Sequence, residues 1–489
     1  MGIDNGAPLM QPLDGLDAAF LSLETPTTPL HVGAVMIFDP PEGTRSLFSP
    51  STRYAQIRSV IAQRLHLVAP LRQRAVRVPL GLHHPVWVDD PDFELDDHLW
   101  RASLPTPGGR QELDAFVAAA MSRPLDPDRP LWEMYVVEGL TGERTALIAK
   151  VHHAILDGVS GASILAAFLD LRPRARAEPT EIGRWDPGPL PGGTQMLRYA
   201  ATSLSHQPAR ALSTLNAGVE AIADLGMHNR ELADRGESPP PGFFSAPRTS
   251  INGAVSNRKR FSSLSIPLED AKLIRHSFGC TVNDVILAGV AGGLRRLLEE
   301  RREAVEHALV AMVPVSTRSE GEGGALGNQI SAMLVSLATD VDDPVQRLTA
   351  IADSTRVAKE QEQLHRGRLL GDLAQIAAPG LVSRLARAVA GTKLFDRVRP
   401  PFNVMVSGVK GPEFPLFCAG SRVTSMCPVG PVAEGVGLNV TIFSYLDRLH
   451  FGFLACRKLL PELDDLAAAV DDSLAELVGH ALEARGAVG

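Results

Sequence analysis

The segment Thr145–Gly158 has the sequence TALIAKVHHAILDG and sets the first expectation for the fold. The apolar, partly β-branched residues up to Val151 predict a β-strand, and two histidines, His152 and His153, follow at its end. Neighbouring side chains on an extended segment point to opposite faces, so the two imidazoles cannot share one role. We therefore expect one of them to face a functional site and the other to pack.

The outward histidine is a candidate general base. Its ordinary pKa of about 6.5 leaves a large neutral fraction near pH 7, and a neutral imidazole can take a proton from a hydroxyl. Asp157 is spaced to return to the loop and fix a ring or backbone conformation, and Gly158 permits a tight turn into the next helix. The motif predicts a positioned base on a stiffened loop.

Three other interpretations of the motif compete with a general base. A histidine pair can simply end a buried strand, as we expect for His83-His84, which has no acidic residue at the matching spacing. Two histidines and an aspartate can bind zinc, but adjacent ligands on a strand diverge and the chain has no H-E-x-x-H helix, so we expect no metal. Ser160 lies in G-V-S-G rather than G-x-S-x-G, which predicts no covalent acyl-enzyme.

Composition places the chain among ordinary globular proteins. Of its 489 residues 45% are hydrophobic and 21% charged, and a net charge of -8 argues against nucleic acid as the main partner. Four cysteines without a C-x-x-C pair indicate reduced thiols and no structural zinc. The N-terminal segment lacks the features of a signal peptide, and no stretch of 18 apolar residues is present. We expect a cytoplasmic protein whose membrane contact is peripheral.

The order of predicted elements indicates a mixed α/β (α+β) fold of two similar halves with a cleft between them. Residues 1–175 form the first half, 176–250 a linker or crossover rich in Pro and Gly, and 251–489 the second half. Each half contains a predicted hairpin, with turns at 141–144 and 446–448. The predicted strands are residues 30–38, 131–140, 145–151, 308–316, 330–338, 402–409, 438–445 and 449–456.

The segment HHAILDG fits the HHxxxDG motif of acyltransferases that use coenzyme A thioesters, a superfamily that includes chloramphenicol acetyltransferases and peptide-synthetase condensation domains. Further segments resemble the bacterial bifunctional wax ester synthase/diacylglycerol acyltransferase family more closely. These segments are PLDGLDAAFLSLETPTTPLHVGA (12–34), PLW (130–132), TVNDVILA (281–288), PVSTR (314–318) and PVGPVAEGVGLNVTIFSYLDRLHFGFLAC (428–456). The resemblance covers nearly the whole chain.

The resemblance implies two chloramphenicol-acetyltransferase-like domains and assigns the general base to His153. That imidazole would deprotonate a hydroxyl of diacylglycerol, or of a long-chain alcohol, during attack on acyl-CoA. Acyl-CoA is then a substrate, and no cofactor is expected. His152 would be a packing or orienting neighbour. Two alternatives stay open: transfer to another acceptor, such as a polyketide or peptide hydroxyl or amine, and a lipid-binding relative with a decayed site.

Asn283 and Asp284 resemble the second motif of the family, although Thr281 and Asp284 also form a T-x-x-D capping box. Negative charge that develops on the thioester oxygen needs a polar donor, for which Asn283, Asn403 and Ser407 are candidates. The chain has Gly408 and Lys410 where relatives commonly have Asn and Pro, which leaves the acceptor preference open.

Both substrates implied by the resemblance partition to lipid, so a docking surface is expected. Residues 381–399 place apolar side chains on one helical face, and five basic residues against one acid give this segment a local charge of +4. This pattern predicts an interfacial helix that contacts the inner membrane face or a lipid droplet. An ordinary surface helix is the alternative.

Overall fold

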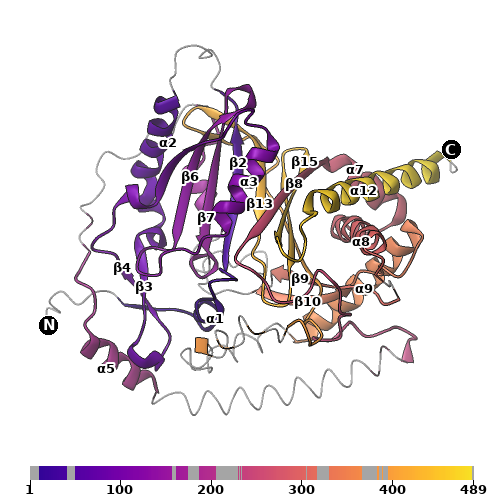
Figure 1. Cartoon of the computed structure of the whole chain (residues 1–489), viewed down its shortest axis with the longest axis horizontal. Coiled ribbons are helices and arrows are strands. Elements are labelled where there is room, and N and C mark those ends of the chain that lie inside the picture. The colour runs from indigo at the N-terminus through magenta and orange to yellow at the C-terminus, as the bar shows by residue number, and fades with distance from the viewer. Residues whose placement is uncertain are drawn as a thin grey trace.

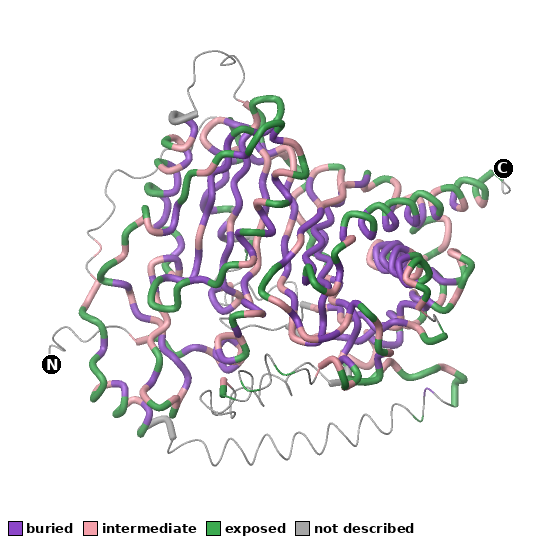
Figure 2. Tube along the Cα trace, viewed as in Figure 1, coloured by how far each residue is buried: buried purple, intermediate pink, exposed green. Residues whose placement is uncertain are grey.

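The computed structural model describes residues 10–40, 50–156, 161–173, 187–204, 234–303, 306–316, 330–365 and 395–486, together with a few single residues between them. Two lobes stand side by side, each built around one six-stranded sheet (Figure 1). Buried segments follow both sheets, while the outer sides of the surrounding helices are exposed (Figure 2). The mixed α/β class is confirmed.

The N-terminal sheet has the strand order β12-β13-β2-β7-β6-β5. Its strands are β12 (Phe417–Cys418), β13 (Ser421–Val429), β2 (His31–Phe38), β7 (Arg144–His152), β6 (Trp132–Leu140) and β5 (Leu99–Ser103). The predicted hairpin is confirmed, because β6 and β7 pair antiparallel across a short turn. Gly142 in that turn has a φ of 75°, a left-handed backbone that glycine adopts without steric cost.

Helices cover both faces of the N-terminal sheet. The helices α2 (Pro50–Arg64) and α4 (Gly161–Phe168) pack on the face that carries Trp132 and Leu147. The helix α3 (Arg110–Met121) packs on the opposite face, against Tyr135 and Ile148. Trp132 is fully buried and donates its indole N–H to the carbonyl of Leu71 at 2.7 Å, so this residue packs the core and takes no part in proton transfer.

The C-terminal sheet has the order β10-β9-β11-β14-β15-β8. Its strands are β10 (Ile330–Ser336), β9 (Val310–Ser316), β11 (Val404–Val409), β14 (Leu438–Tyr445), β15 (Arg448–Cys456) and β8 (Lys259–Pro267). The second predicted hairpin is confirmed by the antiparallel pairing of β14 and β15. Its helices are α7 (Leu268–Phe278), α8 (Val282–Glu300), α9 (Pro344–His365) and α12 (Leu463–Gly486), and their apolar faces bury one side of the sheet.

The N-terminal sheet also contains strands from the second half of the chain, and the longer of these is β13, the exchanged strand. The strand β13 follows β11 in sequence but pairs antiparallel with β2 in the N-terminal sheet, where Met426 lies opposite Met36. In Figure 1 this strand stands next to β2, among elements from the first half of the chain. The predicted boundaries at 175 and 250 stay a prediction for domains, but the sheets do not follow them. Strand pairing between distant segments depends on the assembled structure, and no local sequence pattern specifies it.

The exchanged strand brings the lobes into close contact. Cys427 on β13 donates its thiol to the carbonyl of Phe451 on β15 at 3.3 Å. One residue further, a Cβ placed on Gly452 would lie 1.8 Å from the carbonyl oxygen of Pro428. Only glycine therefore fits at this crossing of β13 and β15.

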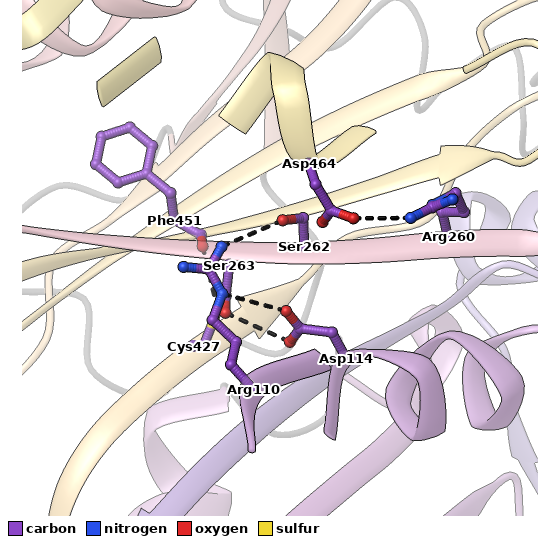
Figure 3. A network of polar contacts seen from close by, with 8 residues as sticks. All are labelled: Arg110, Asp114, Arg260, Ser262, Ser263, Cys427, Phe451 and Asp464. Carbon is purple, nitrogen blue, oxygen red and sulfur yellow. Dashed lines mark hydrogen bonds and ion pairs between the residues drawn. The ribbon is translucent and has the colours of Figure 1, made fainter. Parts of the chain in front are cut away.

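A polar contact joins α3 to β8 on the same side (Figure 3). The Arg110 guanidinium donates to Ser262 Oγ at 3.3 Å, and Ser263 Oγ donates to an oxygen of Asp114 at 3.4 Å. Arg110 and Asp114 also form an ion pair within α3. Burial raises the pKa of Asp114 to about 7, while Arg110 acts in the opposite direction.

A three-stranded sheet of β1 (Gln11–Pro12), β4 (Val86–Asp89) and β3 (Gln73–Val76) flanks the N-terminal lobe. The helix α5 (Gly193–Leu204), from the segment predicted as linker, buries Met196 against it. Among the described residues no single helix is long and apolar enough to span a membrane, although α7 and α8, bent by 101°, reach that length and apolar content together.

Candidate active site

The histidine pair lies where β7 ends and the short 3-10 turn η6 (His153–Ile155) begins. The backbone N–H of His152 donates to the carbonyl of Leu131 at 2.9 Å, and that of His153 donates to the carbonyl of Leu30 at 3.0 Å. The residues that precede β6 and β2 therefore hold the turn from both sides. The helix α1 (Gly15–Leu23) lies against it, below the end of β7 in Figure 1.

His152 is fully buried and orients the turn. Its Nδ1 accepts a hydrogen bond from the backbone N–H of Ala154 at 3.1 Å, which leaves the ring proton on Nε2. Burial, with a smaller contribution from His153, lowers the pKa of His152 to about 3. The Nε2 atom lies 3.8 Å from a carboxylate oxygen of Glu24. His152 is therefore neutral near pH 7, and its only free lone pair is committed to the backbone.

His153 is half-buried and stacks on a phenyl ring. The ring centroids of His153 and Phe20 lie 4.2 Å apart, with the planes tilted by 33°. Burial lowers the pKa of His153 below its usual 6.5. Its Nδ1 is buried and makes no hydrogen bond within the described part of the chain. A neutral imidazole in this position has the protonation state that a general base needs at pH 7.

Buried charges lie on the His152 face of the sheet. The ammonium of Lys150, fully buried two residues before His152, pairs with Glu133 at 3.0 Å. Burial lowers the pKa of Lys150, and Glu133 opposes that shift. Tyr135 donates its hydroxyl to the same Glu133 carboxylate at 2.7 Å. Burial also raises the pKa of Glu24, against the charge of Lys150.

A third histidine pairs with the motif. His31 on β2 lies opposite His152 on β7, and its Nε2 contacts the carbonyl of Met121 at 2.9 Å. Burial and the charge of Lys150 lower the pKa of His31 to about 3. Sequence reasoning did not single out His31, Glu24 or Phe20, and their only signal was membership of the segment 12–34.

The second group of candidate residues lies in the C-terminal lobe, at the start of α8. The predicted capping box is confirmed: Thr281 donates its backbone N–H and its hydroxyl to the Asp284 carboxylate, at 2.8 and 2.7 Å. The Nδ2 of Asn283 is buried and has no hydrogen-bond partner among the described residues. A Cβ placed on Gly408 of β11 would lie 3.8 Å from Asn283 Oδ1, so Asn283 neighbours the position at which the chain departs from its relatives.

The suggested oxyanion role of Asn403 needs correction. Its amide nitrogen donates to the carbonyl of Pro247 and to Asn252, at 2.7 and 2.8 Å, and its amide oxygen accepts the N–H of Val310 at 2.9 Å. Both N–H groups are therefore used, and no donor remains for a substrate. Ser407, half-buried on β11 opposite Thr441, stays a candidate.

Two predictions concern positions outside the described residues. Asp157 and Gly158, which were expected to stiffen the loop, are among them, and so is most of the predicted interfacial helix 381–399. Their roles stay predictions, as does the cleft between the halves.

Comparison with protein families decides the affiliation. The model of the wax ester synthase/diacylglycerol acyltransferase catalytic domain matches residues 13–286, and the model of the family's C-terminal domain matches residues 326–478. The chain belongs to this family. Two Mycobacterium tuberculosis members of the family, both described provisionally as diacylglycerol O-acyltransferases, are similar along nearly their whole length. One is 34% identical over 97% of this chain and 92% of its own, the other 36% identical over 91% and 92%.

Solved structures support the same fold. The wax ester synthase/diacylglycerol acyltransferase from Marinobacter aquaeolei VT8 is 30% identical, with a TM-score of 0.67, and the match covers 96% of this chain and 100% of that one. A trichothecene 15-O-acetyltransferase from Fusarium sporotrichioides shares the fold at 10% identity, with a TM-score of 0.56 over 98% and 96% of the two chains. The predicted acyltransferase fold with two sheet-containing domains is thus confirmed, and the chain is an acyltransferase of the wax ester synthase/diacylglycerol acyltransferase family.

Proposed function

We propose that this acyltransferase esterifies diacylglycerol with acyl-CoA to form triacylglycerol, and also esterifies long-chain alcohols to form wax esters, with His153 as general base. The observation that carries the proposal is the His153 imidazole itself, which is half-buried, has a lowered pKa and is fixed through its backbone by Leu30. Family membership supports the reaction class.

The proposed reaction is a direct transfer. The His153 imidazole accepts the hydroxyl proton while the hydroxyl oxygen attacks the thioester carbonyl. The C–S bond then breaks, and the imidazolium gives its proton to the departing thiolate of coenzyme A. The Asn283 amide supports a further assignment. Its buried Nδ2 has no hydrogen-bond partner among the residues that the structure describes, so it is available to donate to the carbonyl oxygen as negative charge develops. Acyl-CoA is the co-substrate, and the proposed reaction uses no cofactor.

Both substrates carry long apolar chains, so the enzyme is proposed to work at a lipid surface. The support is the sequence pattern of residues 381–399, which combines an apolar face with a local charge of +4. Anionic phospholipids attract such a segment, which supports the proposal that the protein works on the cytoplasmic side of the membrane or on a lipid droplet.

Purified protein with radiolabelled palmitoyl-CoA, offered diacylglycerol and hexadecanol in parallel, tests the reaction and the acceptor class together. We expect labelled triacylglycerol and palmityl palmitate from the wild type and neither product from His153→Ala. The matched control is His83→Ala, which truncates one histidine of the other pair in the chain and should keep activity. Free coenzyme A without either ester, or near-normal ester formation by His153→Ala, contradicts the proposal.

A further inference from the structure

Lys259, a residue of the C-terminal lobe, contacts the segment of the N-terminal lobe that leads to the histidine turn. Lys259 is the first residue of β8 and is 5% exposed. Its ammonium donates to the carbonyl of Thr27 at 2.7 Å and to that of Ser256 at 2.7 Å. Its backbone N–H donates to Ser122 Oγ at 3.1 Å, next to the C-terminal end of α3. Lys259 therefore joins β8 to two segments of the other lobe.

A buried ammonium is costly unless its hydrogen bonds and charges are compensated. Burial lowers the pKa of Lys259, whereas the charges of Cys456 and Glu434 raise it. Methionine of similar length could fill the same space without this desolvation penalty. The contacts of the ammonium, rather than the volume of the side chain, distinguish lysine at this position.

Thr27 belongs to a turn that is rigid by its own hydrogen bonds. The hydroxyls of Thr25 and Thr28 lie 2.7 Å apart, and the N–H of Thr28 donates to Thr25 Oγ1 at 3.1 Å. The backbones of the same two residues form a β-bridge. A displacement at Thr27 is therefore transmitted to both ends of the turn, because the turn moves as one unit.

Both ends of this turn meet the histidine pair. Glu24 precedes the turn and places its carboxylate 3.8 Å from His152 Nε2. Leu30 follows the turn, and its carbonyl accepts the backbone N–H of His153 at 3.0 Å. Through the Leu30 carbonyl, a contact on Thr27 thus acts on the backbone position of His153.

We propose that Lys259 is a positioning residue for the acyl transfer: through Thr27 it fixes the turn 24–30, and through that turn it fixes the His153 imidazole. The inference rests on the proposed function, in which His153 is the base. The active site then depends on both lobes, because the ammonium group of a residue in the C-terminal lobe fixes the position of the general base in the N-terminal lobe.

The test compares Lys259→Met, Lys259→Arg and the control Arg260→Met. Arg260 is the next residue of β8 and pairs with Asp464 of its own lobe, so its loss removes a cation without touching Thr27. In Lys259→Met we expect kcat to fall by about ten- to a hundredfold, as small misplacements of a catalytic group do. The KM for palmitoyl-CoA should stay within about twofold, since no substrate contact is removed. Lys259→Arg should recover most of kcat, and Arg260→Met should keep it.

Hydrogen–deuterium exchange gives a readout that does not need turnover. Backbone amides of residues 24–31 and 152–156 should exchange faster in Lys259→Met than in the wild type, with no change in Arg260→Met. An unchanged kcat and unchanged exchange overturn the inference even where His153→Ala is inactive. A wild type that forms no ester product contradicts the proposed function instead. The exchange measurement then still shows whether Lys259 fixes the turn 24–30.

Discussion

The imidazole of His152 accepts a hydrogen bond from the backbone N–H of Ala154, at 3.1 Å from its Nδ1. One histidine of the motif thereby fixes the turn that carries the other. The two histidines therefore have different roles. His152 is the orienting group, with its pKa lowered to about 3, and His153 is the half-buried candidate base.

The acceptor function of His152 can be separated from its bulk. In His152→Asn the amide oxygen can take the place of Nδ1, and we expect most of the stability and of kcat to remain. In His152→Ala the Ala154 N–H loses its partner and a cavity opens, which should lower the free energy of unfolding by about 2–4 kcal/mol. Urea denaturation and turnover of palmitoyl-CoA measure the two effects. Equal losses in both variants would contradict an orienting role.

The pH dependence of ester formation reports on His153. Its pKa is lowered by burial, and only the neutral imidazole can accept the hydroxyl proton. The kcat/KM should therefore rise with pH through an acid limb below 6.5 and be constant by neutrality. A profile measured from pH 4.5 to 8 locates the limb. A midpoint above 6.5 would show that the base is either another group or a more solvated histidine.

The pKa of Asp114 predicts that this residue's contribution to stability decreases on going from acid to neutral pH. The native carboxyl ionises at about 7, against 3.8 in the unfolded chain, so between these values the native state binds more protons. The contribution of Asp114 to the free energy of unfolding should fall as pH rises from 4 to 7 and then level off. Asp114→Asn should match the wild type at pH 4 and exceed it at pH 8, by up to about 4 kcal/mol.

Chemical denaturation at the two pH values measures this difference. The control is Asp472→Asn, an exposed carboxylate of α12 that pairs with Arg296 and should show no such pH-dependent gain. The wild type and Asp114→Asn would have parallel pH profiles if Asp114 were ionised in the native state throughout.

The crossing of β13 and β15 tolerates no side chain at Gly452. A Cβ there would overlap the Pro428 carbonyl, so Gly452→Ala must displace one strand, and we expect a cost of about 3 kcal/mol or more. The control is Gly479→Ala in α12, where nothing lies within 4 Å and alanine should stabilise the helix by about 0.5–1 kcal/mol. Midpoints of urea denaturation compare the two. A similar midpoint for both variants would contradict the close approach of the lobes.

The sequence predicted the strands and helices of this fold better than it predicted which strands pair with one another. Residues 145–151 were predicted as a strand and lie within β7 (Arg144–His152), because their apolar, partly β-branched pattern is local. The strand β13 escaped prediction, and no local pattern specifies its pairing with β2 across almost the whole chain. The capping box at Thr281 was predicted correctly because both its partners lie within four residues of each other.

The residues of the candidate site also fall into those that a local sequence pattern predicts and those that it does not. The HHxxxDG motif brought His152 and His153 forward, whereas Glu24 and Lys259 act on the turn through contacts between distant segments. Asn283 and Asn403 carry the same amide and could not be ranked from sequence. Only the surrounding atoms show that Asn403 is fully hydrogen-bonded, while the Nδ2 of Asn283 has no partner in the described part of the chain.

The exchanged strand also sets the order of events during synthesis. The edge of β2 stays open until the ribosome has released residues up to Val429, which leaves an unpaired strand edge on the nascent N-terminal lobe for most of translation. A fragment ending before Ser421 would carry the same open edge permanently and is expected to aggregate. The N-terminal sheet is therefore complete only after most of the C-terminal half has been synthesised.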